Sequence, residues 1–265
     1  MAWYTGNAVY DGLLAFGFLY ALGIFISARF GTPAYGGRFG ARSKGLKLGS
    51  KAGWVLMELP ALIAFPIFFF MGDRSGDTVA LVLGGVWMFH YTNRALVNPL
   101  LMRVHPGSPP SFNINVVVIG WAVLVLHSYL NGSFISEHAA HLTEDWLNDP
   151  RFYIGAVVYA IGFTVNVWSD AILRKLRAPD PDPDAPRYKV PHGGLFKYVS
   201  CPQYLGELTS FLGFSIMTWG LGGIYILAVS AANLVPRARV THRWYLRTFP
   251  DEYPKNRKAI IPFLY

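Results

Sequence analysis

Charged side chains are scarce in this chain. Of its 265 residues only 14% are Asp, Glu, Lys or Arg, whereas 53% are hydrophobic, and soluble domains carry roughly 25% charged residues. The shortage argues against an ordinary soluble domain. It predicts an all-α, polytopic integral membrane protein.

Several chemical signatures are also missing. A single cysteine, Cys201, cannot form an intrachain disulfide, and no His/Cys/Asp cluster has metal-ligand spacing, so no metal is expected. There is no nucleophile elbow, phosphate loop or G-x-G-x-x-G motif, so any dinucleotide must be held by a non-Rossmann site. The net charge of +8 is distributed among loops and no nucleic-acid motif is present, so we expect no nucleic-acid partner.

Long apolar runs, in contrast, are abundant. Each is about 20 residues long, the length that a bilayer core requires. The runs are 8–28, 53–71, 78–101, 113–131, 152–174, 203–219 and 222–240. With no internal repeat and no separate soluble portion, the sequence predicts one domain, residues 1–265, with seven transmembrane helices.

The loops between these runs differ in charge. The loop after the first run contains six basic residues and no acid: Arg29, Arg38, Arg42, Lys44, Lys47 and Lys51. Basic loops face the cytoplasm, so alternation places the N-terminus outside and puts loop 175–202 and the C-terminus in the cytosol. The acidic loop 132–151 then lies outside. The membrane would be a bacterial inner membrane or the endoplasmic reticulum.

Polar residues interrupt two of the predicted spans. Glu58 lies about one turn into the second, and the third contains a polar cluster in which Tyr91 and Arg94 are prominent. Buried carboxylates are costly in lipid and usually functional, although polar side chains can also join helices. A phenol and a carboxyl group together could hold a ligand carbonyl, as enolate chemistry requires, so Glu58 and Tyr91 are candidate catalytic residues. Each histidine, His90 included, is expected to be a packing or interface residue rather than a metal ligand.

A further polar face lies in the second half of the fifth run and just beyond it. Asn166, Asp170, Arg174 and Arg177 fall within about 80 degrees of one another on a helix, which suits a multiply charged ligand at the membrane edge. The alternative is a helix end whose arginines extend to lipid head groups. An extended loop is expected at 179–186, where Pro and Asp alternate.

These motifs, taken in order, resemble those of the steroid 5-alpha-reductases. The resemblance rests on Glu58-Leu-Pro, on His90-Tyr91 with Arg94, on Asn166-x-x-x-Asp170-x-Ile-Leu-Arg174-x-Leu-Arg177, on Gly193-Gly-Leu-Phe-x-Tyr-Val-Ser200, on Leu205-Gly-Glu207, and on the tail from His242-Arg-Trp-Tyr245 through Arg257-Lys-Ala-Ile-Ile-Pro262. The chain looks like a bacterial-type member, with the family's C-terminal region at about 113–265.

The resemblance implies a seven-helix reductase in which helices and cytosolic loops cap a cavity for NADPH. It implies hydride transfer to C5 and protonation at C4 of a 4-ene-3-ketosteroid, with Glu58 and Tyr91 at the C3 carbonyl and Trp54 and Met57 beside the substrate. By the same resemblance the cofactor would contact Arg94, Arg103, Asn166, Asp170, Arg174, Arg177, Tyr188, Lys189, Gln203, Glu207, His242 and Tyr245. The expected partners are a steroid or related enone lipid and membrane lipids, and the expected state is a monomer.

The chain departs from the family pattern at three of these positions. Met57 stands where Gln is usual, Lys189 replaces an Arg and so loses the forked donor, and Gln203 replaces an Asn. Two other functions remain open: a membrane methyltransferase that uses S-adenosylmethionine, and a non-enzymatic sterol or lipid transporter. Neither accounts for an acid pair set in two early spans, and a transporter would be expected to show broken helices or related halves.

Overall fold

The computed structural model describes residues 4–28, 30–31, 44–104, 108–177 and 188–265. The loop expected at 179–186 and three arginines of the first basic loop, Arg29, Arg38 and Arg42, lie outside these residues.

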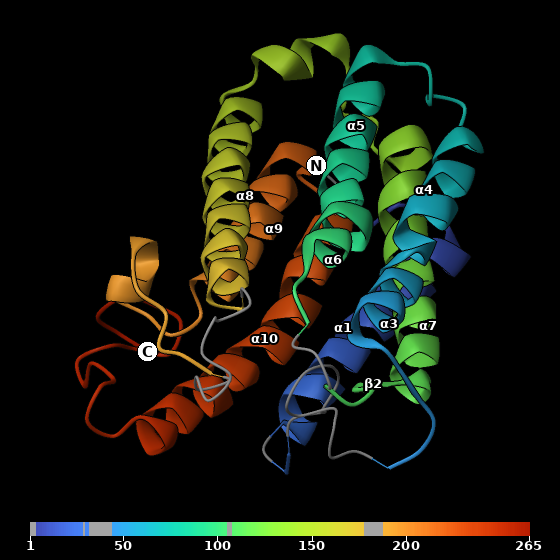
Figure 1. Ribbon diagram of the computed structural model, residues 1–265. Helices are drawn as coiled ribbons and strands as arrows, with labels where there is room; N and C mark the ends of the chain where they lie inside the picture. Colours follow the sequence, from blue (N-terminus) through green and yellow to red (C-terminus); the bar gives the residue numbers. More distant parts are fainter. Residues whose placement is uncertain (1–3, 29, 32–43, 105–107, 178–187) are drawn as a thin grey trace.

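The described chain is a bundle of long helices joined at one end by a two-stranded sheet (Figure 1). Its elements are α1 (Ala8–Ser27), β1 (Lys47–Leu48), α3 (Ser50–Glu58), α4 (Pro60–Phe70), α5 (Thr78–Thr92), η1 (Asn93–Val97), α6 (Asn98–Leu101), β2 (Phe112–Asn113), α7 (Ile114–Ser133), η2 (Phe134–His138), η3 (Glu144–Asn148), α8 (Pro150–Leu176), η4 (Gly194–Lys197), α9 (Pro202–Thr218) and α10 (Leu221–Thr248). The strands β1 and β2 pair antiparallel, with Lys47 opposite Asn113. The predicted helical fold is confirmed, with this short sheet added.

All seven apolar runs are helical, but not all of them form helices long and apolar enough to cross a membrane. Five stretches of the described chain are long and apolar enough: Ala8–Ser27, Ser50–Phe70, Ile114–His138, Pro150–Leu176 and Leu221–Thr248. The third run is α5, which has 15 residues and continues through the polar turn η1. The sixth run is α9, which at 17 residues is about 25 Å long. Five of the seven predicted spans are therefore found by length and composition.

The outer surface of the bundle is apolar. Large hydrophobic side chains are exposed along α1, where Phe16 and Leu19 are 57% and 67% accessible, and along α8, where Val157 and Ile161 are 60% and 56% accessible. Such a continuous exposed apolar surface needs a nonaqueous partner, which agrees with insertion into a membrane.

Three helices begin at residues that cap them. The side chains of Asn7, Asn113 and Asp149 accept hydrogen bonds from the first turns of α1, α7 and α8, where backbone N–H groups otherwise lack partners. At α8, the side-chain hydrogen bond from Arg151 lowers the pKa of Asp149 to about 2.

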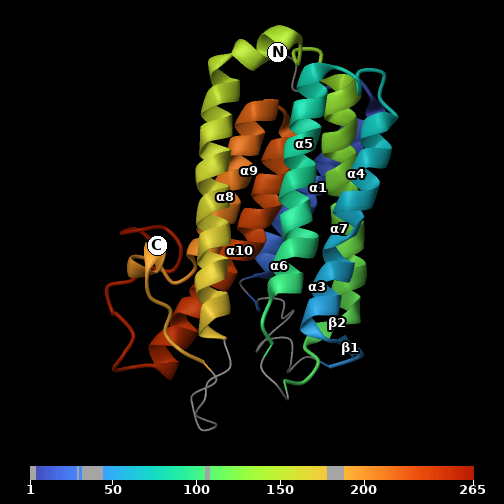
Figure 2. The ribbon, with the colours of Figure 1, turned by 45° about the horizontal axis from the view of Figure 1, so that its top comes forward.

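The two ends of the bundle are built differently. At one end Arg74 donates to the carbonyls of Ala139, at 2.7 Å, and of Leu142, while Trp146 donates to the carbonyl of Met217 at 2.8 Å. These bonds join the connections between helices into a cap. Figure 2 shows the N-terminus near that end and the C-terminus beside α8 and α10.

Helices α8 and α9 pack backbone to backbone. A Cβ added to Gly206 would lie 2.4 Å from the amide nitrogen of Asn166, and one added to Gly162 would lie 2.3 Å from that of Ser210. Small residues permit this approach, as they commonly do in membrane helices. The contact places the polar face predicted on α8 directly against α9.

Candidate active site

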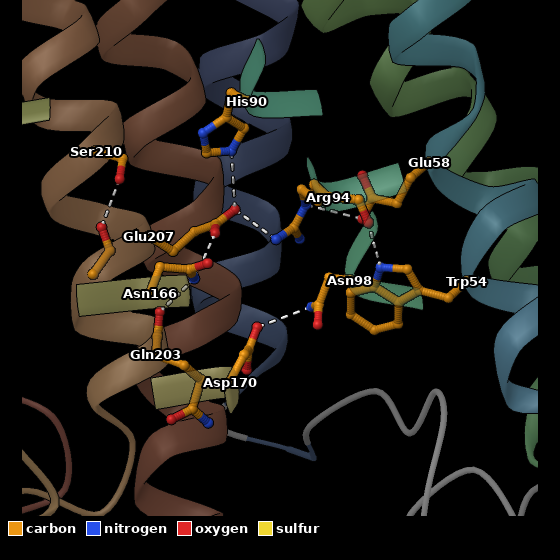
Figure 3. Close-up of polar contacts among 11 residues, drawn as sticks. Trp54, Glu58, His90, Arg94, Asn98, Asn166, Asp170, Gln203, Glu207 and Ser210 are labelled. Atoms are coloured by element: carbon orange, nitrogen blue, oxygen red, sulfur yellow. Dashed lines mark hydrogen bonds and ion pairs between the residues drawn. The ribbon is translucent and has the colours of Figure 1, made fainter. Parts of the chain in front are cut away.

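Six helical elements bring polar side chains together inside the bundle (Figure 3). The contributing residues are Glu58 of α3, His90 of α5, Arg94 of η1, Asn98 of α6, Asn166 and Asp170 of α8, and Gln203 and Glu207 of α9. We call this set the polar network. It unites three predicted groups of site residues that lie far apart in the sequence.

Arg94 links two buried carboxyl groups. Its Nε lies 3.1 Å from Oε1 of Glu58, and its Nη1 lies 2.6 Å from Oε1 of Glu207. Glu58 and Glu207 are only 2% and 3% exposed. The Nε2 of His90 lies 3.6 Å from the same Glu207 oxygen. Because a buried charge is costly unless it is paired, Arg94 makes it possible for both carboxyl groups to lie here.

The backbone at Arg94 has an unusual form. After α5 the chain makes the π-helical turn η1, Asn93–Val97, a widened form often found at functional sites. The indole Nε1 of Trp54 donates to the Arg94 carbonyl at 3.2 Å, and the Arg94 guanidinium lies 5.7 Å from the Trp54 ring centre. Trp54, predicted at the substrate, thus lies beside the residue that holds Glu58.

A second part of the network spans the close contact between α8 and α9. The side-chain amide of Asn166 donates to Oε2 of Glu207 at 3.0 Å and to the backbone carbonyl of Gln203 at 2.9 Å. The side-chain Oε1 of Gln203 is buried and has no hydrogen-bond partner in the structure. The three residues were predicted at the cofactor, and the structure brings them together.

A third contact crosses from α6 to α8. The side-chain amide of Asn98 donates to Oδ2 of Asp170 at 2.9 Å. Arg174 lies one turn further along α8 and is partly exposed, while Arg177, at the C-cap, and Arg103, just after α6, are exposed. The predicted basic residues therefore follow the network toward the end of the bundle that carries the sheet.

The remaining predicted cofactor residues form a separate group near the end of α10. Tyr188 lies against Trp244, with ring centres 5.3 Å apart, and Lys189 is adjacent to it in the chain. Tyr245 stacks on Tyr253 at 5.0 Å.

Ser200 joins this group to the C-terminal tail. Its Oγ lies 2.6 Å from Nδ1 of His242 and 2.5 Å from the hydroxyl of Tyr253. Burial raises the pKa of the Tyr253 phenol, so this hydroxyl is neutral at ordinary pH.

The two other residues predicted near the substrate have apolar surroundings. Tyr91 is 2% exposed and lies against Trp87, with ring centres 4.7 Å apart. Met57 packs in a cluster with Phe112 and Val117, so it belongs to the contact between α3 and α7 and not to the polar network.

Sequence reasoning missed some members of the site. His90 and Asn98 were noted only as members of a polar cluster that suggested a lined cavity, with no role assigned to either, and the structure places both in the network. The tail residue Tyr253, whose hydroxyl contacts Ser200, was not selected either. An exposed polar residue and an inward-facing one look alike in sequence, and only the helix packing distinguishes them. Among the described residues no group of three His, Cys, Asp or Glu side chains could hold a metal ion.

An apolar helical bundle that encloses a hydrogen-bonded polar network defines the protein as an integral membrane protein with an internal polar site. Comparisons with known proteins identify the family. A family model described as 3-oxo-5-alpha-steroid 4-dehydrogenase matches residues 111–265.

Several named relatives match along nearly the whole chain. Steroid 5-alpha-reductase DET2 of Solanum lycopersicum is 36% identical over 97% of both chains. The 3-oxo-5-alpha-steroid 4-dehydrogenase 1 of Homo sapiens is 36% identical over 100% of both, and that of Mus musculus is 36% identical over 94% of this chain and 93% of its own. The chain belongs to the 3-oxo-5-alpha-steroid 4-dehydrogenase family and is an oxidoreductase. These relatives are eukaryotic, so the expected bacterial-type subdivision gains no support.

Proposed function

We propose that the protein is an NADPH-dependent steroid 5-alpha-reductase. It reduces the C4–C5 double bond of 4-ene-3-ketosteroids, such as testosterone or progesterone, to 5-alpha-3-ketosteroids, with a hydride added at C5 and a proton at C4. Residues 1–265 act as one domain and as a monomer, and a related enone lipid is an alternative substrate. Membership of the family supports steroid reduction in general, and the geometry around Glu58 supports the mechanism.

The observation that best supports this proposal is the environment of the Glu58 carboxyl group. One oxygen, Oε1, is held by Arg94, whereas the other, Oε2, is buried and lacks a hydrogen-bond partner in the structure. Buried polar atoms normally have partners, so Oε2 is suited to a ligand atom. Tyr91 is also buried, at 2% exposed, and lies three residues before Arg94 in the same helical run. A ketone oxygen between Tyr91 and a protonated Glu58 would receive two hydrogen bonds.

This arrangement suits the reduction of an enone. Addition at C5 moves electron density onto the C3 oxygen, and donors that are already in place stabilise that charge. Loss of one such donor typically costs about 3 to 4 kcal/mol of transition-state stabilisation. The hydrocarbon-like bundle also dissolves the substrate and excludes water from the reacting carbons.

The residues near the network fit a dinucleotide phosphate. The unpartnered Oε1 of Gln203 and the carboxyl groups of Asp170 and Glu207 provide acceptors for amide and ribose groups, while Arg174 and Arg177 provide forked donors for phosphate. Arg94, Arg103, Asn166, Tyr188, Lys189, His242 and Tyr245 complete the proposed cofactor set. When bound, NADPH supplies the hydride. The protein's part is to orient both molecules, and the surplus of basic residues favours NADPH over NADH.

We further propose that all seven apolar runs cross the membrane, with the N-terminus outside and the C-terminus and cofactor loops in the cytosol. The two runs that fall short of a typical span, α5 and α9, are those that carry His90, Arg94, Gln203 and Glu207. Polar residues are tolerated within a membrane where neighbouring helices cover them. The five apolar stretches would provide that cover, in the endoplasmic reticulum or a bacterial inner membrane.

The methyltransferase and the transporter receive no support from the comparisons, which place the chain among oxidoreductases. A direct test compares NADPH, NADH and S-adenosylmethionine as stabilisers of the purified protein, because a ligand raises the melting temperature of the state that it binds. We expect stabilisation by NADPH above all, together with reduction of progesterone. Stabilisation by S-adenosylmethionine alone would contradict the proposal.

A further inference from the structure

Two buried polar side chains outside the polar network have no assigned task. His127 of α7 is 5% exposed and Tyr225 of α10 is 0% exposed. Both ring nitrogens of His127 and the hydroxyl of Tyr225 lack hydrogen-bond partners in the structure. Buried polar atoms in native proteins are almost always partnered, by protein, water or a ligand.

The two rings form a defined pair. Their centres lie 5.0 Å apart in an edge-to-face arrangement. On its other side the Tyr225 ring fits against Gly17 of α1, where an added Cβ would lie only 2.7 Å from Cε2 of Tyr225. The glycine therefore leaves space for the tyrosine, and three helices converge on the pair.

The pair is not explained by packing alone. At the same junction of α1 and α7, the hydroxyl of Tyr10 donates to the Leu130 carbonyl at 2.8 Å, so the fold supplies a partner to a buried phenol there. Phenylalanine would fill the place of Tyr225 without burying an unpartnered hydroxyl. A hydroxyl and an imidazole side by side suit a shared ligand.

The position of the pair relative to Glu58 follows from how α7 packs against α3 and α4. The indole Nε1 of Trp121 donates to the carbonyl of Leu56, two residues before Glu58, so this part of α7 lies level with the catalytic end of α3. Further along, α4 lies beside α7 at Gly132, where an added Cβ would lie 3.2 Å from the Phe65 carbonyl. The chain therefore runs in the same direction through α3 and α4 as it does through α7. His127 lies six residues beyond Trp121, a rise of about 9 Å along a helix.

This rise of about 9 Å between the level of Glu58 and the level of His127 is comparable with the length of the four fused rings of a steroid. Both ends of the path lie inside the bundle, because Glu58, His127 and Tyr225 are only 2%, 5% and 0% exposed. A substrate with its ketone at Glu58 and Tyr91 would extend toward His127 and Tyr225.

We infer that His127 and Tyr225 form a subsite that hydrogen-bonds an oxygen substituent at the end of the steroid opposite the reacting ketone. The inference deepens the proposed function, on which it rests. Neutral imidazole and phenol can each donate or accept, so the subsite takes a hydroxyl or a ketone. The preferred substrates are therefore enones oxygenated at both ends, as opposed to sterols that end in a hydrocarbon chain.

The test compares testosterone with androst-4-en-3-one, the same enone without the far oxygen. Both Kd, from tryptophan fluorescence, and kcat/KM are measured for the wild type, Tyr225→Phe and His127→Phe. Tyr129→Phe is the matched control, because this α7 tyrosine lies against Phe68, with ring centres 5.2 Å apart. We expect the wild type to favour testosterone and Tyr225→Phe to reduce that preference about five- to tenfold, the usual effect of one hydrogen bond, while Tyr129→Phe leaves it unchanged.

An unchanged preference in Tyr225→Phe, which alters the ring shape little, would overturn the subsite, as would a wild type with no preference. Failure of the proposed function gives a different result, namely no product from either steroid. The Kd ratio then decides on the subsite by itself, since it needs no turnover.

Discussion

The Nε of Arg94 lies 3.1 Å from Oε1 of Glu58. The carboxyl group proposed to hold the substrate ketone is therefore itself held by the neighbouring segment of the chain, and its second oxygen stays free of protein partners. The same guanidinium pairs with Glu207, which lies among the proposed cofactor residues. Arg94 thus connects the two halves of the site.

The proposed donors to the substrate ketone should be required for turnover and not for cofactor binding. We expect Tyr91→Phe and Glu58→Gln each to lower kcat about 100- to 1,000-fold, the usual effect of losing a donor to developing charge, while the Kd for NADPH changes little. Steady-state kinetics and cofactor titration measure the two effects. Tyr153→Phe and Glu137→Gln alter exposed residues and serve as controls. Normal turnover in both site variants would refute the mechanism.

Arg94 should matter for stability as well as for activity. Arg94→Leu leaves Glu58 and Glu207 buried without their cation, and removal of one partner of a buried ion pair typically costs about 3 to 5 kcal/mol. We expect a large fall in the melting temperature, partly restored by Arg94→Lys. Arg103→Leu, at an exposed position, should leave the melting temperature close to that of the wild type. Equal melting temperatures for Arg94→Leu and the wild type would show that the two carboxyl groups do not depend on this pairing.

The basic end of α8 is expected to bind phosphate. Arg177→Ala should weaken NADPH binding about tenfold or more, since a hydrogen bond to a charged group contributes about 1.5 to 3 kcal/mol, and kcat at saturating NADPH should change much less. Lys175→Ala, on another face of the same helix, is the control. If Lys175→Ala and Arg177→Ala weaken binding equally, general charge attraction and not a specific contact is responsible.

The close packing of α8 and α9 should be sensitive to a single methyl group. Gly206→Ala would place its Cβ 2.4 Å from the backbone nitrogen of Asn166, and overpacking of this kind typically costs about 1 to 3 kcal/mol. We expect a lower melting temperature and weaker NADPH binding, because Asn166 would move relative to Glu207. Gly85→Ala meets no atom within 4 Å and should be harmless. If NADPH binding were unaltered in Gly206→Ala, the close contact between α8 and α9 would not be needed for the cofactor site.

The sequence predicted the helices well because apolar runs of sufficient length have few alternatives in a membrane. It also predicted that Asn166, Asp170 and Arg174 share a face of one helix, since helical periodicity determines this locally. It could not predict that Arg94 pairs with both Glu58 and Glu207, because such pairing depends on how distant helices pack. The widened turn η1 has no clear sequence signal. The prediction of NADPH contacts, including those of Arg94, remains a prediction.

The orientation of Met57 shows the same limit. The family resemblance placed it beside the substrate, and the structure packs it against Phe112 and Val117; its contact with a substrate remains a prediction. Adjacent residues on a helix point about 100 degrees apart, so one can face the site while the next supports the fold. The runs at α5 and α9 are not among the five candidate spans, and these helices have 15 and 17 residues.

The most direct measurement follows a labelled hydride. Detergent-purified protein is incubated with NADPH that carries deuterium at both hydrogen positions of C4 of the nicotinamide, together with progesterone, and the product is analysed by mass spectrometry and NMR. The account predicts a 5-alpha product with one deuterium at C5 and ordinary hydrogen at C4, formed by the wild type and almost absent with Tyr91→Phe. Unlabelled product, deuterium at another carbon, or a wild type that binds NADPH but leaves every 4-ene-3-ketosteroid unchanged would contradict it.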